Sequence, residues 1–287
     1  MKIVTDSGAD LPEEEARKLG ITVAPLVIQF PDREIASTEI TPDEFYDRLK
    51  AMAPQIPTTS QPSPGVFSDI YRKLSASGEE ILSIHISLGL SGTIQAARIA
   101  AGEQPEARIT LVDAMTLSGG QRFQVLAADM AARIGWKTDA ILALLDRVRE
   151  ATETIYTLET IEYLARGGRI GRIQALAGTL LGIKPIIKVD KADGKYSSAG
   201  RGRTFSQTMN GIVEHLAKLY GTHQPLWVTV MHGQIAETAE SFAEALRARL
   251  DVGRLDVLRV SPALGVHVGP GVVGAAVMPL SILEGLV

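Results

Sequence analysis

The chain has 287 residues, of which 45% are hydrophobic and 22% are charged, and its formal net charge is −4. This length favours two domains with a sizeable core, and the acidic balance argues against a general nucleic-acid-binding protein, which is usually basic. The chain contains no cysteine, which excludes disulfides, thiolate chemistry and cysteine–metal sites and is typical of a cytoplasmic protein.

In the first half of the chain, short apolar runs alternate with amphipathic stretches, a pattern typical of βαβ units around a parallel sheet. Strands are predicted at residues 2–6, 81–87 and 108–113, and residues 21–30 are expected to be extended. Residues 54–64, rich in Pro, Thr and Ser, are expected to form a loop. Helix starts are predicted at Asp10, Thr41, Ser63, Ser91, Ser118 and Thr138, with the first of these helices ending at Gly20 and the fifth at Gly135.

The pattern changes after about residue 150. Residues 183–189 and 195–203 flank Asp193-Gly194 and predict an antiparallel hairpin. The elements predicted to follow are a helix at 205–220, a strand at 226–231, a helix at 238–250 and a strand at 255–260. The sequence therefore predicts an α/β protein with an N-terminal parallel-sheet domain (1–150) and a C-terminal α+β sandwich domain (151–287).

Residues 260–283 carry no Asp, Glu, Lys or Arg, which raises the question of a transmembrane segment. The stretch also holds three prolines and four glycines, whereas a spanning helix should be continuous and apolar. We therefore expect buried strands and tight turns here and no transmembrane segment. The N-terminus, which lacks a long apolar core, is not expected to be a signal peptide.

Four segments carry side chains suited to ligand binding. The first is residues 58–63, Thr-Thr-Ser-Gln-Pro-Ser, in which four hydroxyl side chains lie between prolines. Turn formation and helix capping would explain them, since Ser63 already has a helix to cap. Hydroxyl donors for a ligand would explain them equally well, and the segment alone does not decide.

The second segment is Ser87-Leu-Gly-Leu-Ser-Gly-Thr93, a predicted turn from a strand into a helix. The free amides at a helix N-terminus attract anions, Ser91 could add a hydroxyl donor, and the glycines allow close backbone approach. A plain helix cap is the alternative. Gly-Leu-Ser-Gly also approaches the nucleophile elbow Gly-x-Ser-x-Gly but misses it, because Thr93 stands where the last glycine would be.

The third segment surrounds His267, in an uncharged stretch with Gly269, Gly271 and Gly274. A buried histidine is more often a structural residue than a functional one, yet a histidine in tight backbone surroundings can donate to an anion. The other four histidines show no metal-ligand spacing, so no metal site is predicted. They are His85, His215, His223 and His232.

The fourth segment, residues 166–172, contributes Arg166, Arg169 and Arg172, and Arg201 and Arg203 follow further along. Arginines can receive a phosphate or an acidic protein surface through forked hydrogen bonds. They could equally be solvated surface side chains, and the charges alone leave both interpretations open.

Taken in this order along nearly the whole chain, the segments resemble the DegV family of bacterial fatty-acid-binding proteins. The matching motifs are Ile3-Val-Thr-Asp-Ser7, Thr59-Ser-Gln-Pro-Ser63, Gly89-Leu-Ser-Gly-Thr93, Val112-Asp113, Tyr163-Leu-Ala-Arg-Gly-Gly-Arg-Ile170, Gly182-Ile-Lys-Pro185 and His267-Val-Gly-Pro-Gly271. The family often has two serines before Gly-Leu-Ser-Gly, and here the second is Leu88, which could remove a polar contact near a head group.

The resemblance implies a two-domain DegV-like fold that buries an acyl chain, with no catalytic residue and no cofactor beyond the bound fatty acid. It implies that Thr59, Ser91 and His267 hold the carboxylate. Ser60, Gly92 and Thr93 are expected to support that head-group loop.

The resemblance also implies that the bound acid is presented to a separate fatty acid kinase, which makes the acyl phosphate used in phospholipid synthesis. Arg169 and Arg203 would then face the kinase or its nucleotide. No nucleic-acid partner is expected.

Two alternatives of a different class stay open at this point. One is a serine hydrolase or acyltransferase with Ser91 as nucleophile, His267 as base and Asp113 orienting it. The other is an enzyme that binds a sugar phosphate or nucleotide at the same glycine-containing helix end. The absence of the Gly-x-Gly-x-x-Gly and P-loop patterns counts against the second.

Overall fold

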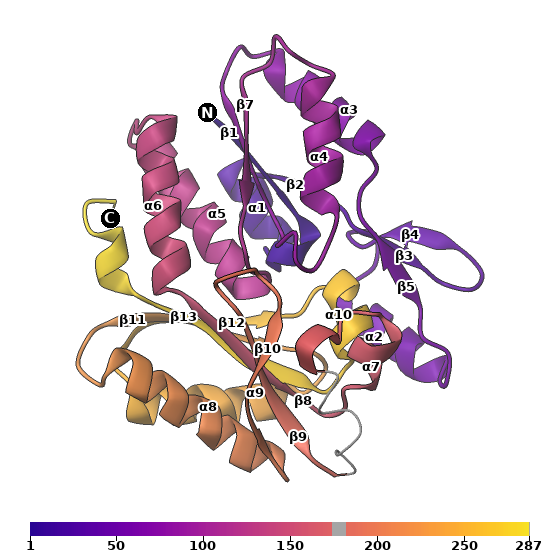
Figure 1. The fold of residues 1–287 in the computed structure, drawn as a ribbon, viewed down its shortest axis with the longest axis vertical. Coiled ribbons are helices and arrows are strands. Elements are labelled where there is room, and N and C mark those ends of the chain that lie inside the picture. Colours follow the sequence, from indigo (N-terminus) through magenta and orange to yellow (C-terminus); the bar gives the residue numbers. More distant parts are fainter. Residues whose placement is uncertain (174–181, 287) are drawn as a thin grey trace.

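The computed structural model describes residues 1–173 and 182–286 and contains three sheets (Figure 1). The N-terminal sheet has four strands in the order β2-β1-β6-β7, and every neighbouring pair is parallel. Its strands are β1 (Lys2–Asp6), β2 (Thr22–Ala24), β6 (Ile81–His85) and β7 (Ile109–Asp113). The central strands β1 and β6 are almost wholly buried, as expected of a parallel sheet with helices on both faces.

Successive side chains of a strand point to opposite faces, and β1 shows this clearly. Val4 packs with Phe67 and Tyr71 under one pair of helices, whereas Ile3 faces the core shared with Phe123. The helices of this half are α1 (Glu13–Leu19), α3 (Pro64–Ser75), α4 (Thr93–Gly102), α5 (Ser118–Arg133) and α6 (Thr138–Ala151), and a 3-10 turn η1 (Ser7–Ala9) follows β1.

A small antiparallel sheet projects from the N-terminal half in the order β4-β3-β5 (Figure 1). Its strands are β3 (Val27–Gln29), β4 (Glu34–Ala36) and β5 (Thr58–Ser60). Helix α2 (Pro42–Ala51) packs beside it and starts after Thr41, as predicted, with a capping box between Thr41 and Glu44.

The C-terminal sheet has six strands in the order β10-β9-β8-β13-β11-β12. Only the pair β11–β12 is parallel, and the other neighbours are antiparallel. The strands are β8 (Glu153–Leu158), β9 (Lys184–Val189), β10 (Tyr196–Gly202), β11 (Leu226–His232), β12 (Val252–Arg259) and β13 (Val272–Pro279). The remaining elements are α7 (Glu162–Arg166), α8 (Phe205–Tyr220), α9 (Ala236–Arg249), α10 (Pro262–Val268) and η3 (Leu280–Leu283).

Helix α5 lies between the two large sheets and joins their cores. On one face of the C-terminal sheet, Trp227 and Met231 pack towards α5. On the opposite face, the alternate residues Val228 and Val230 pack under α8 and α9. Gly120 lets α5 approach the sheet closely, because a Cβ atom there would lie 2.3 Å from Thr154 Oγ1. The result is a continuous apolar layer between the sheets.

The α/β fold class is confirmed, with a parallel N-terminal sheet and a mostly antiparallel C-terminal one. The predicted hairpin is present as β9 and β10. The first helix ends at Gly20, whose φ of 71° suits glycine. The domain boundary near residue 150, close to the end of α6 at Ala151, stays a prediction.

Several local predictions were wrong. Residues 58–60 form strand β5 inside the expected loop, and β8 was not predicted at all. Residues 260–283 contain the short helix α10 as well as β13, not strands and turns alone. In the described part of the chain, no helix is both long and apolar enough to cross a membrane.

Four helix starts were also misplaced. Helix α1 begins at Glu13, with Pro12 as its cap, whereas Asp10 follows the 3-10 turn η1 in a left-handed conformation. Helix α4 begins at Thr93, with Gly92 as its cap, and not at Ser91. Ser118 and Thr138 are the first residues of α5 and α6 and not their caps, because each hydroxyl donates to a carboxylate elsewhere. Ser118 bonds Asp10 and Thr138 bonds Glu80.

Candidate ligand-binding site

Thr59 and His267 come from the two ends of the chain and meet in the structure. Thr59 Oγ1 lies 2.7 Å from His267 Nε2. Thr59 is the central residue of β5 and pairs with Ile28 of β3, so its side chain shares the face on which Ile28 is buried. His267 lies near the end of α10, which packs against β3 and β5.

His267 is held in a neutral state by its surroundings. Burial, and then the positive charge of Arg169, lower its pKa to about 4. Its Nδ1 atom lies against Gly167, where a Cβ atom would be 2.2 Å away, and has no hydrogen-bond partner among the described residues. A neutral imidazole can donate from Nε2 to the Thr59 hydroxyl and leave the proton of that hydroxyl for another acceptor.

The depressed pKa of His267 predicts an acid-dependent stability. The unfolded chain binds a proton at this residue below about pH 6.5, and the folded chain does so only near pH 4, so folded-state stability falls as pH drops through that window. Compared with His267→Gln, the wild type should lose up to about 3 kcal/mol between pH 6.5 and 4. Urea unfolding of both ligand-free proteins across this range measures the difference, and a difference that stays constant with pH would contradict it.

The loop from Ser87 to Thr93 opens α4, as the sequence analysis expected. Ser91 Oγ lies 2.8 Å from Thr93 Oγ1, and the Thr93 amide points back to Ser91 Oγ at 3.4 Å. Ser91 is half-buried, whereas Thr93 is fully buried. The first amides of a helix have no partner within that helix, so the start of α4 offers amide and hydroxyl donors together.

Arg169 and Gln61 connect this loop with the Thr59–His267 pair. The guanidinium of Arg169 donates to the Leu90 carbonyl at 3.5 Å and is close enough to depress the pKa of His267. Gln61 lies against Gly92, where a Cβ atom would be 3.3 Å from Gln61 Nε2. The structure thus brings residues of all four sequence segments to one place.

The tip of the β9–β10 hairpin closes over the same loop, which the sequence analysis missed. Gly194 has a φ of 65°, and a Cβ atom there would lie 1.9 Å from Ser87 Oγ. Across from it, a Cβ atom at Gly89 would lie 2.6 Å from the Asp193 carbonyl oxygen. The two glycines therefore let the hairpin turn and the loop approach each other more closely than larger residues would permit.

A small apolar cavity, with a volume of about 30 Å³, lies next to α10, between α5 and the inner face of the C-terminal sheet. Ligand sites for small molecules usually measure roughly 300–1,000 Å³, so the side chains that line this cavity must move apart to admit an acyl chain. Leu264 and Val268 of α10, one helical turn apart, form part of its wall, and His267 on the same helix faces Thr59. The other lining residues are Leu117, Ser118, Thr154, Tyr156, Met231, Val260, Val272 and Gly274.

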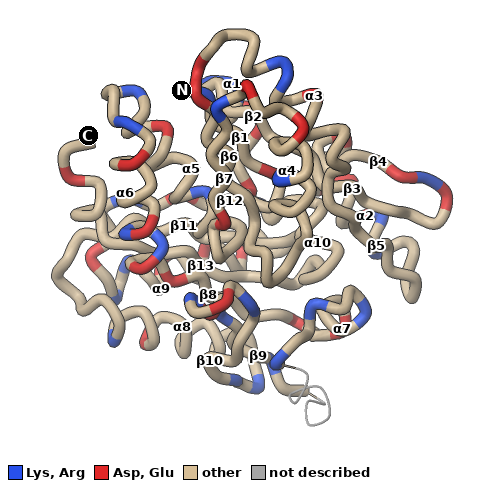
Figure 2. Tube along the Cα trace, turned by 45° about the horizontal axis from the view of Figure 1, so that its top comes forward, with Lys and Arg blue, Asp and Glu red and all other residues tan. Residues whose placement is uncertain are grey.

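Two sequence-predicted residues lie apart from this cluster. Ser60 follows Thr59 in β5, so strand alternation directs its side chain to the opposite face of the small sheet. Arg203 is exposed between β10 and α8, and its backbone amide donates to Gln207. Figure 2 shows basic residues around α7, where Arg166 pairs with Glu162, and at the start of β9.

The three residues of the hydrolase hypothesis are not arranged as a triad. His267 Nε2 bonds Thr59 instead of Ser91. Asp113 accepts the backbone amides of Leu88 and Met115 and makes no hydrogen bond to His267 in the described structure. Ser91 therefore has no base positioned to activate it in this arrangement.

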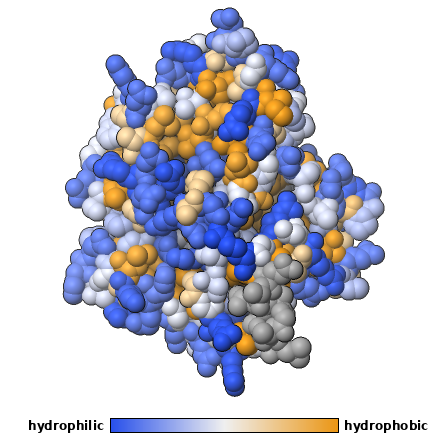
Figure 3. Space-filling model, in the orientation of Figure 1, coloured by the Kyte–Doolittle hydropathy of each residue, from blue (hydrophilic) through white to orange (hydrophobic). Residues whose placement is uncertain are grey.

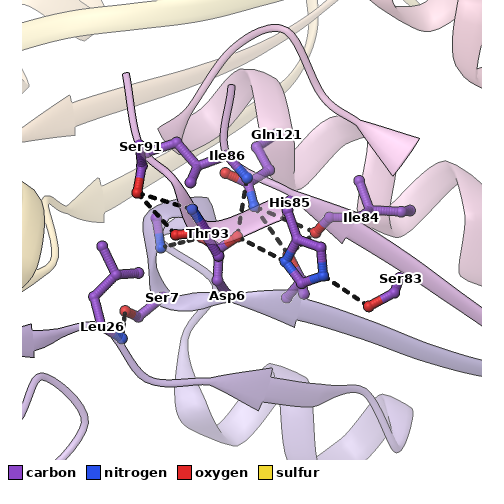
Figure 4. A network of polar contacts seen from close by, with 12 residues as sticks. Asp6, Ser7, Leu26, Ser83, Ile84, His85, Ile86, Ser91, Thr93 and Gln121 are labelled. Atoms are coloured by element: carbon purple, nitrogen blue, oxygen red, sulfur yellow. Dashed lines mark hydrogen bonds and ion pairs between the residues drawn. The ribbon is translucent and has the colours of Figure 1, made fainter. Parts of the chain in front are cut away.

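A buried polar network supports the loop from behind, at the carboxyl ends of β1 and β6 (Figure 4). The Asp6 carboxylate accepts the Gly8 and Ile86 amides at 2.9 Å and His85 Nδ1 at 3.0 Å. His85 Nε2 in turn meets Ser83 Oγ at 2.7 Å. Asp6, Ser83 and His85 have no exposed surface, so this Asp-His-Ser chain is structural and holds Ile86 directly before the ligand loop.

Comparisons with known proteins agree over almost the entire chain. A family model described as "Uncharacterised protein, DegV family" matches residues 1–280. A DegV domain-containing protein of Deinococcus radiodurans is 40% identical over 280 residues, which cover 96% of this chain and 95% of that protein. A DegV domain-containing protein of Clostridium perfringens is 33% identical over 281 residues, covering 96% of this chain and 97% of that protein.

Solved structures show the same fold. A DegV family protein from Thermus thermophilus, described as fatty-acid-binding, is 33% identical with a TM-score of 0.90, covering 97% of this chain and 99% of that one. A stearic-acid-binding protein from Eubacterium ventriosum is 26% identical with a TM-score of 0.89, covering 97% and 98%. Since both the family model and these relatives span nearly the full length, the chain belongs to the DegV family.

Proposed function

We propose that this protein binds a long-chain fatty acid, with the acyl chain in the cavity beside α10 and the carboxylate at Thr59, Ser91 and His267. The observation that carries the proposal is the position of α10, which lines the apolar cavity with Leu264 and Val268 and places His267 against Thr59. The fatty-acid binding described for DegV relatives from Thermus thermophilus and Bacillus subtilis supports it.

The acyl chain would supply most of the affinity. Each buried methylene contributes about 0.8 kcal/mol, so a 16-carbon chain gains on the order of 10 kcal/mol before the costs of ordering are subtracted. The cavity wall suits this role, because its side chains are mainly aliphatic, together with Met231 and the ring of Tyr156.

The carboxylate loses its water on entry and needs donors in exchange, or burial would favour the neutral acid. The hydroxyls of Thr59 and Ser91 and the first amides of α4 would serve as these donors. His267 would act through Thr59 by donating from Nε2 at the 2.7 Å contact, which leaves the hydroxyl proton of Thr59 for the carboxylate. In this scheme Gly92 and Thr93 shape the amide end, and Ser60 supports the strand that carries Thr59.

The protein would act as a carrier without chemistry of its own. It would present the carboxylate to a separate fatty acid kinase in the cytoplasm, which forms the acyl phosphate used in phospholipid synthesis. Arg169, which borders the head-group loop, and the exposed Arg203 would face that kinase or its nucleotide. No cofactor other than the bound acid would be required.

Purified protein should contain bound fatty acid. Native mass spectrometry should show an added mass, and lipid extraction should identify it as a long-chain acid. Delipidated protein should recover the mass shift with added palmitate and should gain thermal stability by mass action. A protein that carries no lipid and takes up none when palmitate is added would contradict the proposal.

A further inference from the structure

Asp10 occupies a strained and buried position directly after η1. Its φ is 49°, in the left-handed region that residues other than glycine rarely adopt, and the residue is 6% exposed. Such backbone strain persists only where surrounding contacts hold it. Asp10 is not part of the ligand site described above.

The contacts of Asp10 join the N-termini of two helices. Its Oδ1 accepts the backbone amide of Ser261 at 2.8 Å, and its Oδ2 accepts the hydroxyl of Ser118. Ser261 is the cap residue of α10, which has no side-chain cap of its own, and Ser118 is the first residue of α5. The positive ends of both helix dipoles therefore point to one carboxylate.

Both helices form walls of the apolar cavity. Ser118 lines it from α5, and Leu264 and Val268 line it from α10. His267, which meets Thr59, is carried on α10 as well. A shift of α10 relative to α5 would change the cavity and the head-group contact together.

We propose that Asp10 is a positioning residue of the ligand site, which holds α10 against α5 so that His267 faces Thr59 and the apolar cavity keeps its shape. The expected effect of Asp10 on fatty-acid affinity rests on the function proposed above, but its expected effect on the position of His267 does not. Asp10 would act without touching the ligand, through its hydrogen bonds with the Ser261 amide and the Ser118 hydroxyl.

The buried surroundings of Asp10 make its negative charge unfavourable. Burial raises the pKa of Asp10 to about 6, although its hydrogen bonds from Ser118 and Ser261 lower it. The other ionisable groups that face it are Tyr46 of α2, with Arg259 beyond its ring, and Tyr196 of β10. An ionised carboxylate loses its water here, and the hydrogen bonds from Ser118 and Ser261 replace part of that solvation.

Two variants separate the carboxylate from the backbone strain. Asp10→Gly and Asp10→Asn both tolerate a φ near 49°. Asparagine can still accept from the Ser261 amide and can donate to the Ser118 hydroxyl, whereas glycine makes neither contact. Thr204→Ala is the control, because it removes the side-chain cap of α8, which does not line the cavity.

The first readout is the imidazole ¹⁵N shift of His267 in delipidated protein, which is measurable because the chain has five histidines. Asp10→Gly should move the Nε2 signal of His267 and leave that of the buried His85 in place. Asp10→Asn and Thr204→Ala should keep the wild-type shift. An unmoved His267 signal in Asp10→Gly would overturn the positioning role, whether or not the protein binds fatty acid.

The second readout is palmitate affinity. Asp10→Gly should bind about tenfold more weakly than wild type, as expected for one lost positioning contact, while Asp10→Asn should stay close to wild type. If Asp10→Asn lost as much affinity as Asp10→Gly, the hydrogen bonds to the helix ends would not be the cause and the proposal would fail. A wild type without palmitate binding would contradict only the proposed function, because the His267 shift would still be informative.

Discussion

Fatty-acid binding should weaken by about 100-fold when Thr59→Val and Ser91→Ala are combined. Each hydroxyl is expected to donate one hydrogen bond to a carboxylate, and such charge-assisted bonds contribute about 1.5–3 kcal/mol, so two of them amount to at least about 3 kcal/mol. Valine preserves the shape of Thr59, and alanine removes only the Ser91 oxygen. Isothermal titration of delipidated protein with palmitate measures the change.

Ser60→Ala is the matched control for this pair. Ser60 also carries a hydroxyl in β5, but strand alternation turns it away from the His267 face. Its loss should change affinity much less than that of Thr59. Wild-type affinity in the Thr59→Val, Ser91→Ala double variant would show that the carboxylate is held elsewhere.

Asp6→Ala is expected to destabilise the fold by about 3–5 kcal/mol, because it leaves several buried donors without an acceptor. The Gly8 amide, the Ile86 amide and His85 Nδ1 all depend on the Asp6 carboxylate, and Asp6 has no exposed surface. Urea unfolding at pH 7 measures this loss.

Asp113→Ala provides the comparison at the end of β7, which is separated from β1 by strand β6 in the same sheet. Asp113 accepts the Met115 amide at 2.8 Å and the Leu88 amide at 3.2 Å but is only half-buried, so water can replace it in part. Its loss should be about 1–2 kcal/mol. Equal losses for Asp6→Ala and Asp113→Ala would contradict the account of the buried network.

The elements predicted correctly are those whose signals are local. Thr41 and Ser63 cap their helices through the nearby amides of Glu44 and Val66, and Gly20 ends α1 in a left-handed conformation. Ser118 resembles such a cap in the sequence, but its hydroxyl is used by Asp10, far away in the chain. Local patterns cannot show such long-range competition for a side chain.

Strand β5 and helix α10 were missed for related reasons. Thr58–Ser60 is flanked by prolines and is a strand only because it pairs with β3. Helix α10 is buried on all sides, so its sequence shows no alternation of polar and apolar residues. Gly265 within it makes room for Phe45 and Tyr46, because a Cβ atom at this position would lie only 2.7–2.8 Å from the Phe45 ring and the Tyr46 hydroxyl. Tertiary packing and not propensity determines both elements.

The candidate site likewise combines a feature that could be predicted from local sequence with long-range contacts that could not. The loop from Ser87 to Thr93 could be interpreted from its own residues as an anion site at a helix start. The contact of Thr59 with His267 joins residues 208 positions apart, and only the family resemblance suggested that they act together. The contact of Gly194 with Ser87 left no signal beyond a glycine in a hairpin turn.

A structure of the protein bound to palmitate tests the central claim most directly. The account predicts the carboxylate within hydrogen-bond distance of Thr59 Oγ1 and Ser91 Oγ. It predicts the acyl chain between α5 and α10, in contact with Leu264, Val268 and Met231. A carboxylate bound away from both hydroxyls, or an acyl chain outside this cavity, would contradict it.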